Sequence, residues 1–291
     1  MGEQTDVRDA VRRFVEDASS FADLDAELWE PISLATILRS DPQLGELVLD
    51  ACCGDGASAV PTAELVGPDG LVDAVDVAAP MIELARARAA ALGAGRGEGA
   101  AGDLLPQLSF HVADVAEWQT EGYDLVQCVL GVFFFDDLDA GARQLVSRAK
   151  PGGRVAITLW GADAFSGFTE LLVSAVEAEA GEDAVAGFRE RMQRHEEPGT
   201  AGALAHWLHT LGLVDVRAEE VPRHLDLDDD LAWRLVLGTG RQRLVADLDD
   251  ETRERVRGRF VAALRDHGVA RVDIGTIVGV GRRPEEPVAP A

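Results

Sequence analysis

The sequence predicts an α/β protein whose core is a doubly wound, mostly parallel sheet of seven strands with helical insertions. From Leu47 onward, short apolar runs alternate with amphipathic stretches, and this alternation is typical of strands joined by right-handed helical crossovers. The 291 residues are enough for one main core with elaborations. A composition with 47% hydrophobic and 27% charged residues is ordinary for a globular protein.

Seven apolar runs are the expected strands, and three amphipathic stretches are the expected crossover helices. The strands cover 47–50, 71–77, 108–113, 123–129, 154–160, 213–221 and 269–283. The helices cover 57–66, 80–92 and 138–149, with Pro80 suited to a first helical position. Further helices are expected within 164–211 and 228–267, and the glycine-rich segment 93–103 is expected to be a mobile surface loop.

This order of elements predicts five parts of the chain. We expect an N-terminal helical cap at 1–45, a ligand-binding sheet core at 46–160 and a helical insertion over the substrate region at 161–211. The last two strands, with a second insertion at 228–267, occupy 212–283, and a disordered tail occupies 284–291. The cap and the insertions are the segments from which a lid could form.

The formal charge of −25 and the pI near 4.5 exclude some classes of partner. Such a charge repels phosphate backbones and anionic lipid surfaces, so we expect neither nucleic acid nor membrane as a partner. Three cysteines, two of them adjacent, form no disulfide framework and indicate a reducing compartment, so we expect a cytoplasmic location. We also expect a monomer or homodimer. The start of the chain lacks the apolar core of a signal peptide, and the longest apolar run, at 125–135, is too short to span a bilayer.

A glycine-containing turn follows the first strand in the stretch LVLDACCGDGASAV, residues 47–60. A strand, a turn and a helix in this order place backbone N–H groups and the positive helix end beside a ligand. Read as a dinucleotide fingerprint, residues 54–59 match G-x-G-x-x-A, and Asp76 lies 20 residues after Gly56. However, Asp55 between the glycines would repel a pyrophosphate, and this interpretation leaves Asp50 and Asp114 without a role.

The other cofactor class is S-adenosylmethionine, which carries no phosphate but has a sulfonium and an ammonium group. Carboxylates suit such a ligand, and Asp50, Asp76 and Asp114 stand at the ends of the first three strands. Open parallel sheets bind their ligands at this edge. The three acids therefore favour the cationic cofactor over the dinucleotide.

Five motifs in order carry a family resemblance. They are VLDACCGDG, VDAVDVAAPMIELARAR, FHVADVAEW, YDLVQCVLGVFFF and KPGGRVAITLW, and together they cover about Leu47 to Trp160. On these motifs the chain resembles the class I S-adenosylmethionine-dependent methyltransferases, especially the small-molecule branch of ubiquinone/menaquinone-type and natural-product enzymes. The resemblance implies a Rossmann-like fold and a role in secondary metabolism. The family usually has glycine where Cys52 stands, and we interpret Cys52 as a tolerated substitute.

The resemblance also implies roles for individual residues. The first motif would surround the methionine part of the cofactor, the second would bind the ribose hydroxyls through Asp76 and face the adenine, the third would bind the adenine edge, and the fourth would pass next to the sulfonium. In chain order, the implied cofactor residues are Asp50, Cys52, Cys53, Gly54, Gly56, Asp76, Val77, Met81, Asp114, Val115, Cys128 and Val129.

The sequence says less about the residues that bind the methyl acceptor. The sulfonium of the cofactor already activates its methyl group for transfer, so positioning of the acceptor alone lowers the barrier to methyl transfer considerably and no catalytic motif is required. Aromatic and apolar residues near the sheet edge are expected to line the substrate pocket, although core packing is the alternative role. An oxygen acceptor needs a base, and His224 and His195 are the candidates. No spacing of ligands indicates a metal site. The expected pocket residues are Leu130, Phe133, Phe134, Trp160, Phe165 and Trp29.

The predicted function is O- or C-methylation of an apolar or aromatic small molecule. Two alternatives keep the same fold and cofactor: a cyclase or isomerase, and a binding protein that does not methylate. A third alternative is an NAD-dependent dehydrogenase, which rests on the weak dinucleotide fingerprint.

Overall fold

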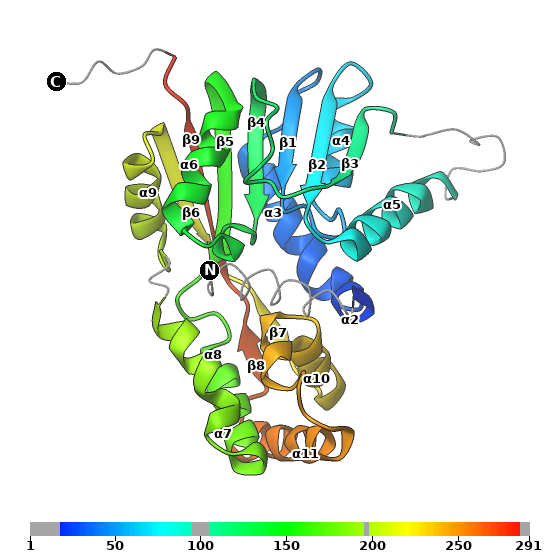
Figure 1. Cartoon of the computed structure of the whole chain (residues 1–291), viewed down its shortest axis with the longest axis vertical. Coiled ribbons are helices and arrows are strands. Elements are labelled where there is room, and N and C mark those ends of the chain that lie inside the picture. The colour runs from blue at the N-terminus through cyan, green and yellow to red at the C-terminus, as the bar shows by residue number, and fades with distance from the viewer. Residues whose placement is uncertain (1–17, 95–104, 195–197, 286–291) are drawn as a thin grey trace.

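The computed structural model describes residues 18–94, 105–194 and 198–285. Seven strands form one sheet in the order β3-β2-β1-β4-β5-β9-β6 (Figure 1). The first five strands pair in parallel, and β9 runs antiparallel to both of its neighbours, so the predicted mostly parallel sheet is present. The strands are β1 (Leu47–Ala51), β2 (Leu71–Asp76), β3 (Leu108–Val112), β4 (Tyr123–Val129), β5 (Ala149–Trp160), β6 (Val214–Val221) and β9 (Thr276–Arg282).

Helices cover both faces of the sheet because successive strand residues point to opposite sides. Val48 packs with α4 and α5, whereas its neighbour Leu49 packs in the cluster that contains α6 and α9. Asp137 caps α6 by accepting a hydrogen bond from the Ala140 N–H at 2.8 Å, which gives this acid a structural role. The helices on the sheet are α3 (Glu30–Ser40), α4 (Ala59–Val66), α5 (Ala79–Ala94), α6 (Leu138–Arg148) and α9 (Ala201–Thr210).

A helical subdomain lies beyond the carboxyl ends of the parallel strands (Figure 1). Its core is apolar and includes Phe168 and Phe260, whose rings meet edge to face with centroids 4.9 Å apart. The subdomain comprises α7 (Ser166–Ala180), α8 (Asp183–Arg194), α10 (Asp229–Leu237), the 3₁₀-helix η3 (Gly240–Leu244), α11 (Asp250–Asp266) and the two-stranded sheet of β7 (His224–Asp226) and β8 (Arg271–Asp273).

The structure differs from the predicted organisation at two places. Helix α9, expected in the first insertion, packs on the sheet, where Gly279 leaves room for Leu204 and Leu208. The run 269–283, expected as one strand, is divided into β8, which pairs with β7, and β9, which pairs with β5 and β6. Most of the predicted loop 93–103 and the end of the predicted tail lie outside the described residues.

The N-terminal segment supplies a short helix, α2 (Ala18–Ala22), and a π-helical turn, η1 (Asp25–Trp29), before α3 begins. Trp29 stacks on Phe21 with ring centroids 4.3 Å apart and donates its indole N–H to the Phe21 carbonyl. This cap therefore holds an aromatic pair next to the sheet.

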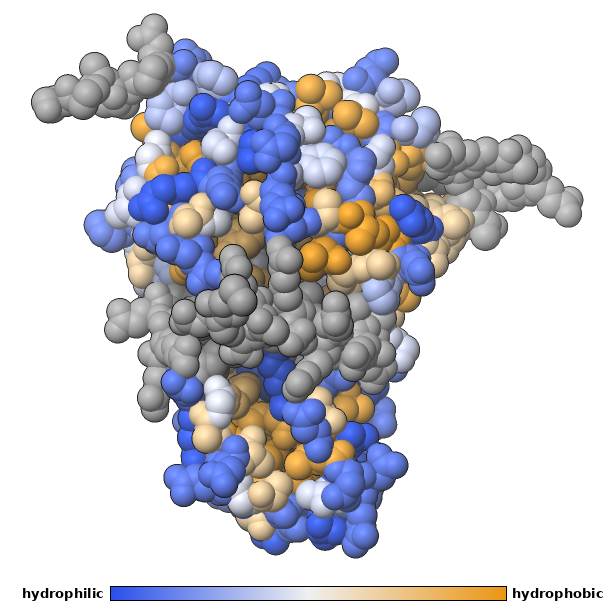
Figure 2. All heavy atoms as spheres, in the orientation of Figure 1, coloured by the Kyte–Doolittle hydropathy of each residue, from blue (hydrophilic) through white to orange (hydrophobic). Residues whose placement is uncertain are grey.

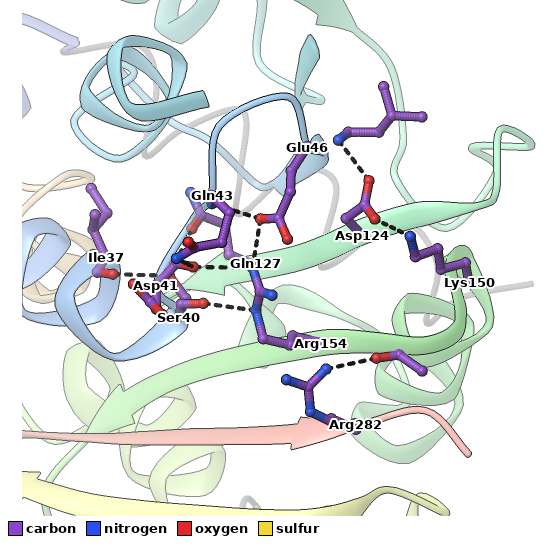
Figure 3. Close-up of polar contacts among 12 residues, drawn as sticks. Ile37, Ser40, Asp41, Gln43, Glu46, Asp124, Gln127, Lys150, Arg154 and Arg282 are labelled. Atoms are coloured by element: carbon purple, nitrogen blue, oxygen red, sulfur yellow. Dashed lines mark hydrogen bonds and ion pairs between the residues drawn. The ribbon is translucent and has the colours of Figure 1, made fainter. Parts of the chain in front are cut away.

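Hydrogen bonds and ion pairs link the end of α3 with the starts of neighbouring strands (Figure 3). Arg154 donates to the Ser40 carbonyl at 3.0 Å and pairs with Glu46 at 2.6 Å, and both charged side chains are mostly buried. Asp124 accepts a hydrogen bond from the Leu47 N–H at 2.9 Å and pairs with Lys150. These contacts fix the starts of β1, β4 and β5.

The visible surface over the sheet is mainly hydrophilic in Figure 2, and apolar residues also show over the helical subdomain. Within the described ranges, no helix combines the length and the apolar character that a membrane span requires.

Candidate cofactor and substrate site

The loop between β1 and α4 has a backbone that favours glycine. Cys52, Gly54 and Gly56 all have positive φ, at 56°, 54° and 81°. A Cβ atom on Gly56 would lie 3.1 Å from the Cβ of Ala85 in α5, so glycine at this position also allows close packing. Cys52 adopts the left-handed conformation at a cost of about 1–2 kcal/mol, which is the physical reason that glycine suits its position. The loop thereby forms a narrow backbone cradle at the sheet edge.

Asp76 ends β2 directly beside this loop. Its Oδ2 accepts a hydrogen bond from the Gly54 N–H and its Oδ1 accepts one from the Ala78 N–H, both at 2.9 Å. Burial raises the pKa of Asp76 above its ordinary value, against the opposing effect of these two hydrogen bonds. Each oxygen keeps a further lone pair, so the fixed carboxylate can accept two more hydrogen bonds, as a vicinal diol would supply.

Asp50 lies under the loop and is fully buried. Its Oδ2 accepts hydrogen bonds from the Ser58 hydroxyl at 2.7 Å and from the Gln127 amide at 3.2 Å, whereas its Oδ1 has no hydrogen-bond partner. Burial raises the pKa of Asp50 to about 7. The side chain therefore supports the cradle from below, with its unpaired oxygen buried.

The predicted adenine-side residues differ in exposure. Val77 is 48% exposed and Asp114 is half-buried, with its Oδ1 accepting a hydrogen bond from the Ala116 N–H at 2.9 Å. Val115 and Met81 are buried, the first against the sheet and the second in a small cluster with Ala78, Phe21 and Leu84. Val77 and Asp114 are thus the members of this group that keep surface at the sheet edge.

Phe21 from the cap lies closest to the cradle, with its Cζ 3.9 Å from the Cβ position of Gly54. The sequence offered no signal for this placement, because Phe21 precedes the first strand by a whole helix. The cap therefore contributes an aromatic surface to the loop.

The end of β4 is packed tightly against Cys52. A Cβ atom on Gly131 would lie 2.5 Å from the Cβ of Cys52 and 2.7 Å from the Sγ of Cys128, so a side chain has no room there. Leu130 has a φ of 54°, and Val129 before it is half-buried. This sharp turn brings the end of β4 next to the cradle.

All three cysteines are free thiols. The pKa of Cys52 is raised, mainly by a hydrogen bond with Cys128 and in second place by burial. Burial is the main cause of the raised pKa of Cys53. Protonated thiols are poor metal ligands. Among the residues that the structure describes, no cluster of three or more potential ligands could hold a metal ion.

The predicted substrate residues fall into two groups. Phe165 is 1% exposed and the Arg241 guanidinium covers its ring at 3.7 Å, so Phe165 belongs to the core and not to the wall of a pocket. Leu130 is mostly buried in the same apolar cluster. Partly exposed surface remains on Trp29, Phe133, Phe134 and Trp160.

Of the two candidate bases, the structure describes only His224. His224 is exposed on β7, with its Nε2 3.6 Å from Asp273 Oδ2. The other oxygen of Asp273 accepts a hydrogen bond from the Gly275 N–H at 2.6 Å, which holds this carboxylate in place. His195 lies outside the described residues.

Asp55, the acid between the two glycines of the loop, is paired with an arginine. Arg88 of α5 pairs with Asp55 and with Asp25, both at 2.5 Å. The three side chains line a hollow of about 460 Å³ whose wall does not include Asp76 or Asp114. Because Asp55 is paired with Arg88, it would repel a pyrophosphate less strongly than the sequence suggests.

Comparisons with known proteins agree with this geometry. The methyltransferase domain family matches residues 48–153. Nocamycin O-methyltransferase from Saccharothrix syringae is 32% identical over 220 residues, which cover 72% of this chain and 73% of that enzyme. Aklanonic acid methyltransferase DauC from Streptomyces sp. strain C5 is 31% identical over 153 residues. These residues cover 52% of this chain and 64% of that enzyme, which is less than two thirds of its length.

One solved structure shows the same fold. Phosphoethanolamine N-methyltransferase 2 from Haemonchus contortus, in complex with phosphomonomethylethanolamine and S-adenosylhomocysteine, aligns with a TM-score of 0.50 and 17% identity. The alignment covers 87% of this chain and 52% of that chain. This chain thus spans about half the length of that protein.

Proposed function

The chain belongs to the class I S-adenosylmethionine-dependent methyltransferases of small molecules, and we propose that it methylates an oxygen or carbon atom of an apolar or aromatic metabolite. Family membership removes the NAD-dependent dehydrogenase alternative. The relatives named for nocamycin and aklanonic acid support a natural-product substrate.

The observation that carries the proposal is the cradle at the ends of β1 and β2. Three residues with positive φ shape the loop, and the Asp76 carboxylate, fixed by two backbone N–H groups, keeps two acceptor positions. Asp76 would hold the ribose hydroxyls of S-adenosylmethionine, the loop would hold its methionine part, and Asp114 would hold its adenine. The bound cofactor supplies a methyl group on a positively charged sulfur.

The protein's own contribution is mainly to position the acceptor and exclude water. Phe133 and Phe134 follow the end of β4, Trp160 is the last residue of β5, and all three are only partly buried. Such side chains suit a planar, poorly hydrated acceptor.

His224 is the proposed base for an oxygen acceptor. Its Nε2 is close to the Asp273 carboxylate, which would stabilise the imidazolium formed when the ring accepts a proton from a hydroxyl group. A carbon acceptor that is already enolic would need this base less.

Cofactor binding is tested by isothermal titration with S-adenosylmethionine. We expect Asp76→Ala to weaken binding about 10- to 100-fold, because the ribose loses a charged hydrogen-bond partner. Unchanged affinity would show that Asp76 does not bind the ribose.

Methyl transfer is tested by measuring S-adenosylhomocysteine by mass spectrometry after incubation with aklanonic acid and with 1,4-naphthoquinol. His224→Asn is expected to lower kcat about 10²- to 10⁴-fold for an oxygen acceptor and to leave cofactor affinity unchanged. His267→Asn, at the exposed end of α11, is the matched control. Tight cofactor binding without turnover of any acceptor would favour the binding-protein or cyclase alternative.

A further inference from the structure

Arg241 has an unusual environment for an arginine. Its Nε donates to the Thr169 hydroxyl at 2.8 Å, and its Nη1 donates to the Thr239 hydroxyl at 3.4 Å. Its guanidinium carbon lies 3.7 Å from the centroid of the Phe165 ring. Among the described residues, no carboxylate lies within ion-pair distance of Arg241, and its Nη2 forms no hydrogen bond.

Three other partly buried arginines have acidic partners, whereas Arg148, Arg223 and Arg283 are partly buried and form no ion pair with a described acid. Arg88 pairs with Asp25 and Asp55, Arg154 pairs with Glu46, and Arg234 pairs with Glu27. The chain has 52 acidic residues and only 27 lysines and arginines, so acidic partners are plentiful. A desolvated cation without an anion is unfavourable, and a site that binds an anion resolves this cost.

The charge of Arg241 persists at neutral pH. Burial lowers the pKa of Arg241 to about 9, which still leaves the guanidinium protonated at pH 7. Arg241 as a whole residue is only partly buried.

The position of Arg241 connects it with the acceptor side of the site. Phe165, under the guanidinium, meets Trp160 at the end of β5 edge to face, with centroids 5.2 Å apart. The Phe165 N–H also donates to the carbonyl of Asp273, the partner of His224. Arg241 therefore stands at the junction of the sheet edge and the helical subdomain.

We propose that Arg241 is a substrate-binding residue that pairs with a carboxylate or enolate group of the methyl acceptor. This inference rests on the proposed function. The Nη1 and Nη2 edge of the guanidinium can form two parallel hydrogen bonds to a carboxylate, and the stacked Phe165 ring holds the plane in a fixed orientation. The preferred substrates are then aromatic or enolic acids, and the corresponding neutral amides are bound less well.

A structural role for Arg241 is the competing explanation, since its Nε joins η3 to α7 through Thr169. That role requires a hydrogen-bond donor but not a charge. Arg241→Gln keeps a donor of this kind and removes the charge, so it separates the two explanations.

The test is a calorimetric titration of the protein saturated with S-adenosylhomocysteine, with 2-naphthoate and 2-naphthamide as a matched anionic and neutral pair. We expect the wild-type protein to prefer naphthoate by about 10-fold or more, as a charged hydrogen-bonded pair provides. Arg241→Gln and Arg241→Met should abolish the preference, and Arg241→Lys should retain part of it. Arg255→Gln, which removes an exposed cation of α11 paired with Glu179 and Glu251, should leave it unchanged.

Equal affinity of the wild-type protein for the two probes, or no binding of either, would overturn the proposal. A preference that survives in folded Arg241→Gln, with its S-adenosylhomocysteine affinity intact, would overturn it as well. Failure of the proposed function has a different signature, because the anion preference would then be present without methyl transfer to any acceptor.

Discussion

The buried carboxyl group of Asp50 makes the stability of the protein depend on pH. Burial raises its pKa from an ordinary value of 3.8 to about 7. Between these two values the folded protein keeps the proton that the unfolded chain releases, so the free energy of unfolding falls as the pH rises through this window. The favourable contribution is complete below about pH 4 and is lost above about pH 7. Asp50→Asn has no ionisable group at this position and should not show this loss.

The magnitude follows from the width of the window. Each pKa unit corresponds to 1.36 kcal/mol, so the full window amounts to about 4 kcal/mol. Between pH 5 and pH 8, where the experiment is practical, the wild-type protein should lose about 2–3 kcal/mol relative to Asp50→Asn.

Urea unfolding of both proteins at pH 5, 6, 7 and 8 measures this difference. Asp124→Asn is the control. Burial acts to raise the pKa of Asp124, but the hydrogen bond from the Leu47 N–H and the charge of Lys150 together have the larger, opposite effect. The pKa of Asp124 is therefore below its ordinary value. The stability that Asp124 contributes is lost only as the pH falls below the ordinary range, so Asp124→Asn should differ from wild type equally at all four pH values. A difference between wild type and Asp50→Asn that stays constant from pH 5 to pH 8 would refute the reasoning.

Three other substitutions test the packing around the sheet. Arg154→Met should destabilise the protein by about 2–4 kcal/mol in urea, because Glu46 would remain buried without its partner; an unchanged midpoint would contradict this. Gly131→Ala should cost about 1–3 kcal/mol by thermal unfolding, because its Cβ would clash with Cys52 and with Cys128, and adding Cys52→Gly should recover only part of the loss because the clash with Cys128 remains. Cys52→Gly alone should change stability by no more than about 1 kcal/mol and leave S-adenosylmethionine affinity intact. A large loss of affinity would mean that the Cys52 side chain is needed and that it is not a tolerated substitute.

The sheet was predictable because strand periodicity is a local property of the sequence. The run 123–129, for example, matches β4 (Tyr123–Val129) residue for residue. The division between β8 and β9 was not predictable, since the two segments pair with different strands, β8 with β7 and β9 with β5 and β6, and this pairing is not a local property of the sequence. The placement of α9 likewise depends on Gly279, a residue far from the helix in sequence, which leaves room for its leucines.

The site shows the same limit. The sequence places Asp50 and Asp76 at adjacent strand ends, but it does not reveal where their side chains point. Ser58 and Gln127 hold Asp50 under the loop, whereas Gly54 and Ala78 hold Asp76 beside it. Arg241 carries no sequence signal at all, because its partners Thr169 and Phe165 lie about 70 residues earlier.

These placements change the electrostatic argument for the cofactor. Asp55 pairs with Arg88, and Asp50 is buried and only partly ionised at neutral pH, so the carboxylates that remain at the sheet edge are those of Asp76 and Asp114. On the proposed acceptor side the charge is reversed, because Arg241 has no acidic partner among the described residues in a chain of net charge −25. Salt screens long-range repulsion within about 8 Å at physiological ionic strength, so a contact at Arg241 can decide whether an anionic substrate binds despite that net charge. A site for a positively charged methyl donor and a negatively charged acceptor needs a cation that is separated from the acidic residues. In our proposal Arg241 is that cation.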